Sequence, residues 1–154
     1  MKSLIIYFSW SNNTKKLVEG INEVFHYDTY RIERTSPYSA DYNTCAYIEA
    51  KEEWEKRLLP SIKDIAVDLS QYERILLFFP IWWYTFPMPV GTFIKENLSS
   101  YQGEVIIFAN SYTNDYQYVV NSLKDAQKLN PNLNIKEGLF NVNIDKHIKF
   151  IKEQ

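Results

Sequence analysis

The sequence contains little cysteine and little glycine. It has one cysteine, Cys45, and four glycines among 154 residues. A single cysteine excludes an internal disulfide, and we interpret Cys45 as a structural residue because neither histidine is near it in the sequence. Neither the G-x-G-x-x-G turn of a dinucleotide site nor the Gly-Lys-Ser/Thr segment of a Walker site occurs, so both nucleotide-binding classes are excluded.

Blocks of like charge and long apolar runs are also missing. The 17 basic and 19 acidic residues give a net charge of −2. Such a chain matches neither nucleic acid nor an anionic membrane. The first apolar run, Leu4–Phe8, is too short for a signal peptide or a membrane span. We therefore expect a cytoplasmic protein with no nucleic-acid partner and no membrane partner.

Clusters of histidine, cysteine and carboxylate with the spacing of a metal site do not occur in the sequence. The two histidines, His26 and His147, each fall on an expected helix, where a surface or packing role is the simpler interpretation. We assign no catalytic acid, no catalytic base and no metal ligand from the sequence.

What is present is an alternation of short apolar runs with segments of helical periodicity. The content of hydrophobic residues, 45%, is enough for the core of one domain over residues 1–154. Strands are expected at 4–8, 29–33, 74–79, 104–109 and 133–140, and helices at about 14–25, 43–59, 88–98, 116–126 and 144–151. This order predicts a doubly wound α/β fold with a parallel sheet.

The expected helix 43–59 carries three oppositely charged pairs four residues apart. The pairs are Lys51 with Glu55, Glu52 with Lys56, and Glu53 with Arg57. We interpret them as one solvated face with no binding role. Asn43 or Thr44 is expected to cap the start of this helix, and Pro60 to end it.

Ligands of open α/β sheets bind beyond the carboxyl ends of the strands. The segment Ser9–Lys15 lies at the first such end and opens a helix. Hydroxyl and amide side chains, with the free N–H groups of a helix N-terminus, suit a phosphate. The same residues can also be ordinary helix caps without a ligand, and the sequence leaves both interpretations open.

A second strand end carries Trp82, Trp83 and Tyr84 in a loop bracketed by prolines. Such a loop either folds back and buries its own rings or lines a slot for a flat ring. Beside a phosphate turn on the neighbouring strand, the slot describes a site for a mononucleotide with an aromatic head.

These segments together resemble the flavodoxin-like family of FMN-binding proteins, in its short bacterial branch. Ser9, Ser11, Asn13 and Thr14 match its phosphate loop, Ser/Thr-x-Ser/Thr-Gly-Asn-Thr. Pro-Ile-Trp-Trp at 80–83, Pro-Met-Pro at 87–89 and Pro-Tyr-Ser-x-Asp-Tyr-Asn at 37–43 are typical of that branch. The resemblance spans essentially the whole chain. It implies a three-layer sandwich whose five-stranded sheet has the order 2-1-3-4-5, with FMN at its carboxyl edge.

The resemblance also implies which residues contact FMN. The phosphate would be held by Ser9, Ser11, Asn12, Asn13 and Thr14. Residues 80–84 would contact the isoalloxazine ring, and residues 110–113 would close over its pyrimidine side. The expected FMN-binding residues are Ser9, Trp10, Ser11, Asn12, Asn13, Thr14, Pro80, Ile81, Trp82, Trp83, Tyr84, Asn110, Ser111, Tyr112 and Thr113.

The chain replaces glycines that are usual in these loops. Asn12 stands at the glycine of the phosphate loop, and asparagine tolerates left-handed backbone, so we expect the turn to survive. Tyr84 stands at the glycine beside flavin N5, where a bulky residue resists positive φ by about 1–2 kcal/mol. We therefore expect weak stabilisation of the one-electron reduced flavin. The third loop, 110–115, also lacks the usual glycines.

The implied function is an oxidoreductase, similar to an NAD(P)H:quinone reductase, in which FMN supplies the redox chemistry. It would pass electrons from NAD(P)H or a reductase to a quinone-like acceptor, so a small molecule or a protein is the expected redox partner. Two alternatives stay open: a one-electron carrier, disfavoured by the small net charge, and an interaction module that has lost FMN together with its glycines. Pairing into a homodimer is also left open.

Overall fold

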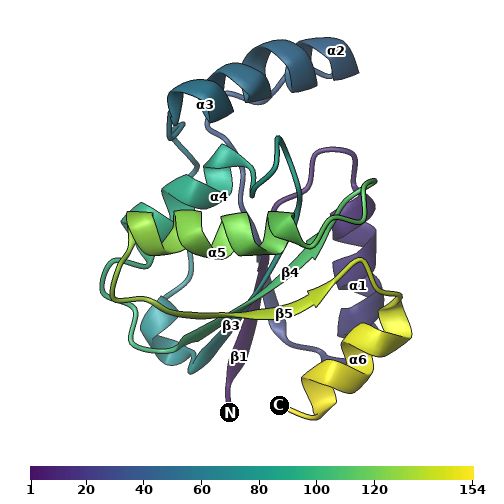
Figure 1. Ribbon diagram of the computed structural model, residues 1–154. Coiled ribbons are helices and arrows are strands. Elements are labelled where there is room, and N and C mark those ends of the chain that lie inside the picture. The colour runs from purple at the N-terminus through teal and green to yellow at the C-terminus, as the bar shows by residue number, and fades with distance from the viewer.

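The computed structural model describes residues 1–154 as an open parallel sheet with helices on both faces (Figure 1). The elements are β1 (Ser3–Tyr7), α1 (Asn13–Phe25), β2 (Asp28–Arg31), α2 (Tyr42–Thr44), η1 (Cys45–Ala50), α3 (Lys51–Lys56), η2 (Leu69–Gln71), β3 (Arg74–Pro80), α4 (Met88–Thr92), η3 (Phe93–Asn97), β4 (Glu104–Asn110), α5 (Gln117–Leu129), β5 (Asn134–Phe140) and α6 (Ile144–Lys152). The strand order is β2-β1-β3-β4-β5, which confirms the predicted fold.

The central strands β1, β3 and β4 bury both of their faces. In β1, Leu4 and Ile6 join a larger apolar cluster with residues of α4 and α5, whereas Ile5 joins a smaller cluster with residues of α1 and α6. Figure 1 shows the same division of helices between the two faces of the sheet. Parallel sheets covered on both sides need such nearly continuous apolar strands, which explains why these strands could be predicted. The edge strand β2 ends at Arg31, two residues before the expected end.

One continuous helix comprises α2, η1 and α3, and Figure 1 places it above the carboxyl ends of the strands. Its first turn is capped by Asp41, whose carboxylate accepts a hydrogen bond from the Thr44 N–H at 2.9 Å. The expectation of Asn43 or Thr44 as the cap is therefore wrong. The helix ends at Lys56 instead of residue 59, because Arg57 turns to left-handed backbone with φ 52°.

Two of the three expected charge pairs on this helix form. They are Lys51–Glu55 at 3.7 Å and Glu52–Lys56 at 3.4 Å. The third does not form, because Glu53 is buried and pairs with Arg34 at 3.1 Å instead of with Arg57. The interpretation of the whole charged run as a solvated face is therefore wrong for Glu53.

The histidines and the cysteine take structural positions. His147 is buried in α6 against the rings of Phe78 and Phe108, and burial lowers its pKa to about 4. His26 lies just after α1, with φ 55°, and not within the helix as expected. Cys45 is buried, and burial raises its pKa to about 11. The structure contains no group of three or more histidine, cysteine or carboxylate side chains able to hold a metal ion, and no helix of membrane-spanning length and apolarity.

Candidate functional site

A cavity of about 440 Å³ opens at the carboxyl edge of the sheet, where the strand order reverses between β1 and β3. Its volume falls within the roughly 300–1,000 Å³ of small-molecule sites, and open α/β sheets bind their ligands at such switch points. The cavity brings together thirteen of the fifteen predicted site residues. They are Ser9, Trp10, Ser11, Asn13, Thr14, Pro80, Ile81, Trp82, Trp83, Asn110, Ser111, Tyr112 and Thr113. Asn12 and Tyr84 do not line it.

The turn after β1 owes its shape to Asn12, which adopts φ 70° directly before α1. The Asn12 side chain caps no N–H of α1, and its Oδ1 instead accepts a hydrogen bond from Arg31 at 3.2 Å. Ser9 Oγ accepts from the Lys15 N–H at 3.3 Å, which closes the turn. Thr14 Oγ1 donates to Asn110 Oδ1 at 3.2 Å and so joins this turn to the loop after β4.

The loop after β3 reverses direction at Trp83 and Tyr84. The Trp82 N–H donates to the Thr85 carbonyl at 2.9 Å, and the two residues between them have φ values of 50° and 72°. Positive φ at both central positions defines a type I′ turn, which Asn-Gly normally occupies. Tyr84 therefore adopts the positive φ that its bulk resists. Its ring does not line the cavity and packs against the Trp54 ring, with the two ring centroids 5.4 Å apart.

The two tryptophans of this loop pack against the protein and also line the cavity. The Trp82 ring meets Phe8 and Tyr38 edge-on, with centroids 5.1 and 5.3 Å apart. The Trp83 indole N–H donates to the Ala46 carbonyl at 2.7 Å, which ties the loop to η1. The loop therefore packs its rings against the protein, and Trp82 and Trp83 also line the cavity. The slot for a flat ring stays a prediction.

The sequence analysis missed one wall of the cavity. Its residues, all from α2 and η1, are Tyr42, Cys45, Ala46, Tyr47 and Ala50. The run of uncharged residues at 45–48, directly before the charged pairs, is the signal that could have identified it. η1 is a π-helical turn, an irregularity that is frequent at functional sites.

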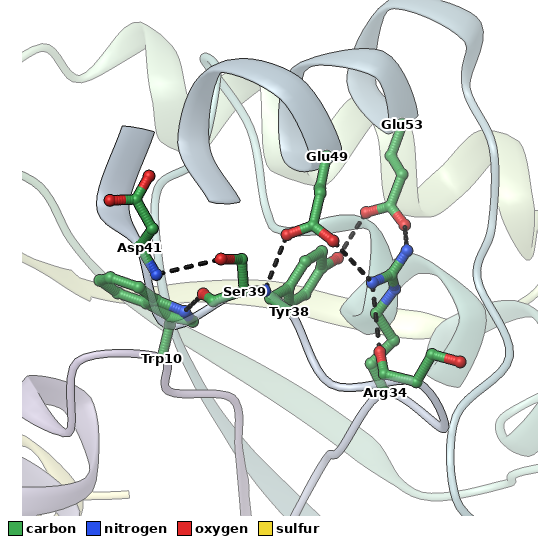
Figure 2. Close-up of polar contacts among 8 residues, drawn as sticks. Trp10, Arg34, Tyr38, Ser39, Asp41, Glu49 and Glu53 are labelled. Atoms are coloured by element: carbon green, nitrogen blue, oxygen red, sulfur yellow. Dashed lines mark hydrogen bonds and ion pairs between the residues drawn. The ribbon is translucent and has the colours of Figure 1, made fainter. Parts of the chain in front are cut away.

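A buried carboxylate, that of Glu53 in α3, anchors the part of the helix that follows this wall (Figure 2). The Tyr38 hydroxyl donates to Glu53 Oε1, and Arg34 Nη2 lies 3.1 Å from Glu53 Oε2. The Arg34 guanidinium also lies over the Tyr38 ring, 4.3 Å from its centroid. Burial raises the pKa of Glu53, although both of these hydrogen-bond donors act to lower it. Burial raises the pKa of Tyr38 as well.

The same network reaches the turn after β1. Glu49 Oε1 accepts from the Ser39 N–H at 2.8 Å, and the Ser39 carbonyl accepts from the Trp10 indole N–H at 3.1 Å. Figure 2 shows this chain of contacts running from Glu49 through Ser39 to Trp10. The segment before α2 thus links the helix above the sheet to the turn after β1.

The cavity has no charged side chain in its lining, which contains no Asp, Glu, Lys, Arg or His. An anion there must be held by N–H, hydroxyl and amide groups, and the loops after β1 and β4 both supply them. A smaller cavity of about 370 Å³ lies beside β5 and the start of α5, and of the predicted loops it involves only Asn114. Thirteen of the fifteen predicted residues therefore line the larger cavity, and none of the fifteen lines the smaller one.

A family model described as Flavodoxin matches residues 2–152 of this chain. A candidate flavoprotein of Bacteroides eggerthii has a crystal structure that is 29% identical, with a TM-score of 0.82, covering 99% of this chain and 96% of that one. A flavoprotein of Lactobacillus acidophilus, crystallised in complex with FMN, is 25% identical with a TM-score of 0.77, covering 91% and 93%.

Among curated proteins, the uncharacterized NAD(P)H oxidoreductase YcaK of Escherichia coli is 22% identical over an alignment of 104 positions, which covers 62% of this chain. The chain spans about half the length of that relative, 53%.

Proposed function

Because the chain belongs to the flavodoxin family, we propose that it is an FMN-dependent oxidoreductase that passes electrons from NAD(P)H or a reductase to a quinone-like acceptor. The observation that carries the proposal is the cavity itself, which joins a helix-N-terminal turn rich in hydroxyl and amide groups to a wall of aromatic rings. FMN has the same two parts, a phosphate and a flat ring, so the residues present fit it.

In this proposal three loops hold the cofactor. Residues 9–14 bind the phosphate, residues 80–83 contact the isoalloxazine ring, and residues 110–113 cover its pyrimidine side. Tyr84 contributes no side chain to the site, because it does not line the cavity and its ring packs against Trp54. Bound FMN supplies the redox chemistry, and the protein binds it, orients it and limits the access of water.

The tight turn favours two-electron over one-electron chemistry. Rotating the Trp83–Tyr84 peptide out of a type I′ turn gives a type II′ turn, in which Trp83 would combine positive φ with ψ of about −120°. Only glycine adopts that combination readily. The peptide beside the proposed ring site is therefore held in one orientation, which removes a backbone adjustment to a one-electron reduced flavin. Trp83 imposes this restriction on the Trp83–Tyr84 peptide.

The proposal is tested by adding FMN to flavin-stripped protein and following flavin fluorescence. We expect saturable quenching by the nearby rings. In a Ser11→Glu variant, which places a negative charge in the phosphate turn, we expect FMN binding to be at least tenfold weaker. Ser100→Glu makes the same change at an exposed position next to the amino end of β4 and should leave binding unchanged. Unquenched flavin in the presence of folded protein would overturn the proposal and favour the flavin-free interaction module.

The reaction is then tested by steady-state oxidation of NADH or NADPH with a quinone as acceptor. Turnover that depends on FMN loading supports the enzyme over the carrier. Light scattering decides whether the chain pairs into a homodimer, which stays a prediction.

A further inference from the structure

One wall of the cavity has no role in the proposed FMN site, which uses only the three loops. It is the wall formed by α2 and η1, in the helix that lies above the carboxyl edge of the sheet. This wall is rigidly held, because the Ala46 carbonyl accepts from the Trp83 indole and the buried Glu53 anchors the following turn of the helix. It is therefore a fixed surface facing the same space as the proposed cofactor.

Four aromatic rings form a continuous row along this side of the cavity. Ring centroids are 6.1 Å apart for Trp10 and Tyr42, 6.2 Å for Tyr42 and Tyr47, and 5.5 Å for Tyr47 and Trp83. We call Trp10, Tyr42, Tyr47 and Trp83 the aromatic row. Tyr42 and Tyr47 are 56% and 54% exposed. Exposed apolar surface gathered at a cavity marks a binding surface far more often than scattered exposed rings do.

Charge decides which ligands this surface suits. No charged side chain lines the cavity, and Lys51, whose Nζ lies 5.5 Å from the Trp83 ring centroid, already pairs with Glu55 at 3.7 Å. An ionised ligand beside the aromatic row would therefore lose its hydration for little gain in ion pairing. Flat rings, in contrast, gain offset-stacked or edge-on contacts with tyrosine and tryptophan. The complement of the aromatic row is therefore an uncharged, planar aromatic compound.

We propose that Tyr42 and Tyr47 of the aromatic row form the docking wall for the electron acceptor, and that the acceptor is an uncharged planar ring of the quinone class. This inference rests on the proposed function, since it places the acceptor in the space between the helix wall and the FMN held by the three loops. It assigns the choice of acceptor to α2 and η1, which lie outside the predicted FMN-binding residues.

The experiment measures equilibrium binding to FMN-loaded, oxidised protein with no electron donor present, so that no turnover occurs. The probes are 1,4-naphthoquinone and its 2-sulfonate, which share one ring system and differ in charge. Calorimetry should show saturable binding of the neutral quinone and at least tenfold weaker binding of the sulfonate. Tyr42→Ala and Tyr47→Ala should each weaken binding of the neutral quinone about tenfold, whereas Tyr→Phe at either position should change it less than threefold.

Ile48→Ala is the matched control. Ile48 is 62% exposed on the same π-helical turn and does not line the cavity, so its truncation should leave quinone binding unchanged. The affinity for FMN is measured first in every variant. If the wild-type protein binds no FMN, the proposed function fails and this inference fails with it. If FMN binds normally, the inference alone is overturned by equal binding of the two quinones or by unaltered binding in both alanine variants.

Discussion

Replacing Tyr38 with phenylalanine removes a single oxygen atom from the network of Figure 2. The ring keeps its edge contacts with Phe8 and Trp82, at 6.4 and 5.3 Å. What is lost is the hydrogen bond from the Tyr38 hydroxyl to Glu53 Oε1. The Glu53 side chain is only 7% exposed, so water cannot fully replace that donor, and the Arg34 guanidinium at 3.1 Å remains as its main partner.

The expected effect is a loss of about 2 kcal/mol in the free energy of unfolding near neutral pH. A hydrogen bond to a charged group contributes about 1.5–3 kcal/mol, and the retained Arg34 keeps the loss below that of an unpaired buried charge. The variant should also raise the pKa of Glu53 further above its ordinary value, because the lost bond favours the ionised carboxylate. A carboxyl group whose folded-state pKa is raised gains stability as the pH falls. The difference between variant and wild type should therefore shrink in acid.

Urea unfolding at pH 7.5 and pH 5 measures both effects. Tyr72→Phe is the control, because the Tyr72 hydroxyl donates to Asp28 Oδ2 at 2.6 Å at the protein surface. There solvent replaces the bond, and we expect a loss of at most about 0.5 kcal/mol. The assignment of Glu53 as a buried, ionised anchor would be refuted by either of two results. One is an equal loss of unfolding free energy in the two variants, and the other is a loss in Tyr38→Phe that is no smaller at pH 5 than at pH 7.5.

Three further predictions concern other parts of the fold. Because burial holds the pKa of His147 at about 4, protonation of the unfolded chain should lower the free energy of unfolding as the pH falls below the ordinary histidine pKa. The free energy of unfolding, measured with urea, should fall by about 2 kcal/mol between pH 7 and pH 5. This fall should disappear in the His147→Leu variant and remain in the control variant His26→Asn. Asn12→Ala should lower the urea-unfolding free energy by about 1–2 kcal/mol, through left-handed backbone strain and loss of the Arg31 bond, while Asn12→Gly should cost less than about 1 kcal/mol. Stepwise anaerobic reduction of the FMN-loaded wild-type protein should accumulate little one-electron reduced flavin. The Trp83→Gly variant should accumulate more of it than Trp83→Ala, because both variants lack the indole but only glycine lets the Trp83–Tyr84 peptide rotate.

The sheet could be predicted because its buried strands have apolar sequences. Residues 75–79 and 105–109 are apolar on both faces, and the helices between the strands follow a period of 3.6, so element order and topology follow from pattern alone. The ends of helices and strands could be predicted less well. The cap at Asp41 depends on which of several polar neighbours takes the extended backbone of a cap residue, and the sequence offered Asn43 and Thr44 equally well.

The three loops of the candidate site could be predicted because consecutive residues carry them and strand ends converge. The wall from α2 and η1 could not, since its residues reach the cavity only through packing between the helix and the segment after β2. Glu53 illustrates the difficulty. A glutamate four residues before Arg57 indicates a surface pair by every local rule, yet Arg34, nineteen positions earlier, supplies the charge that allows it to be buried.

The turn at Trp83 and Tyr84 is another feature that the sequence could not predict. The identity of Tyr84 indicated resistance to positive φ, but resistance by one residue does not say which turn the loop forms. The Trp82–Thr85 hydrogen bond, the Trp83 indole bond to η1 and the Tyr84 contact with Trp54 together stabilise two left-handed residues. Once both are left-handed, the residue that restricts further rotation is the first of the pair. At the proposed flavin site, we therefore expect Trp83 to restrict rotation of the Trp83–Tyr84 peptide, and a glycine there would remove that restriction.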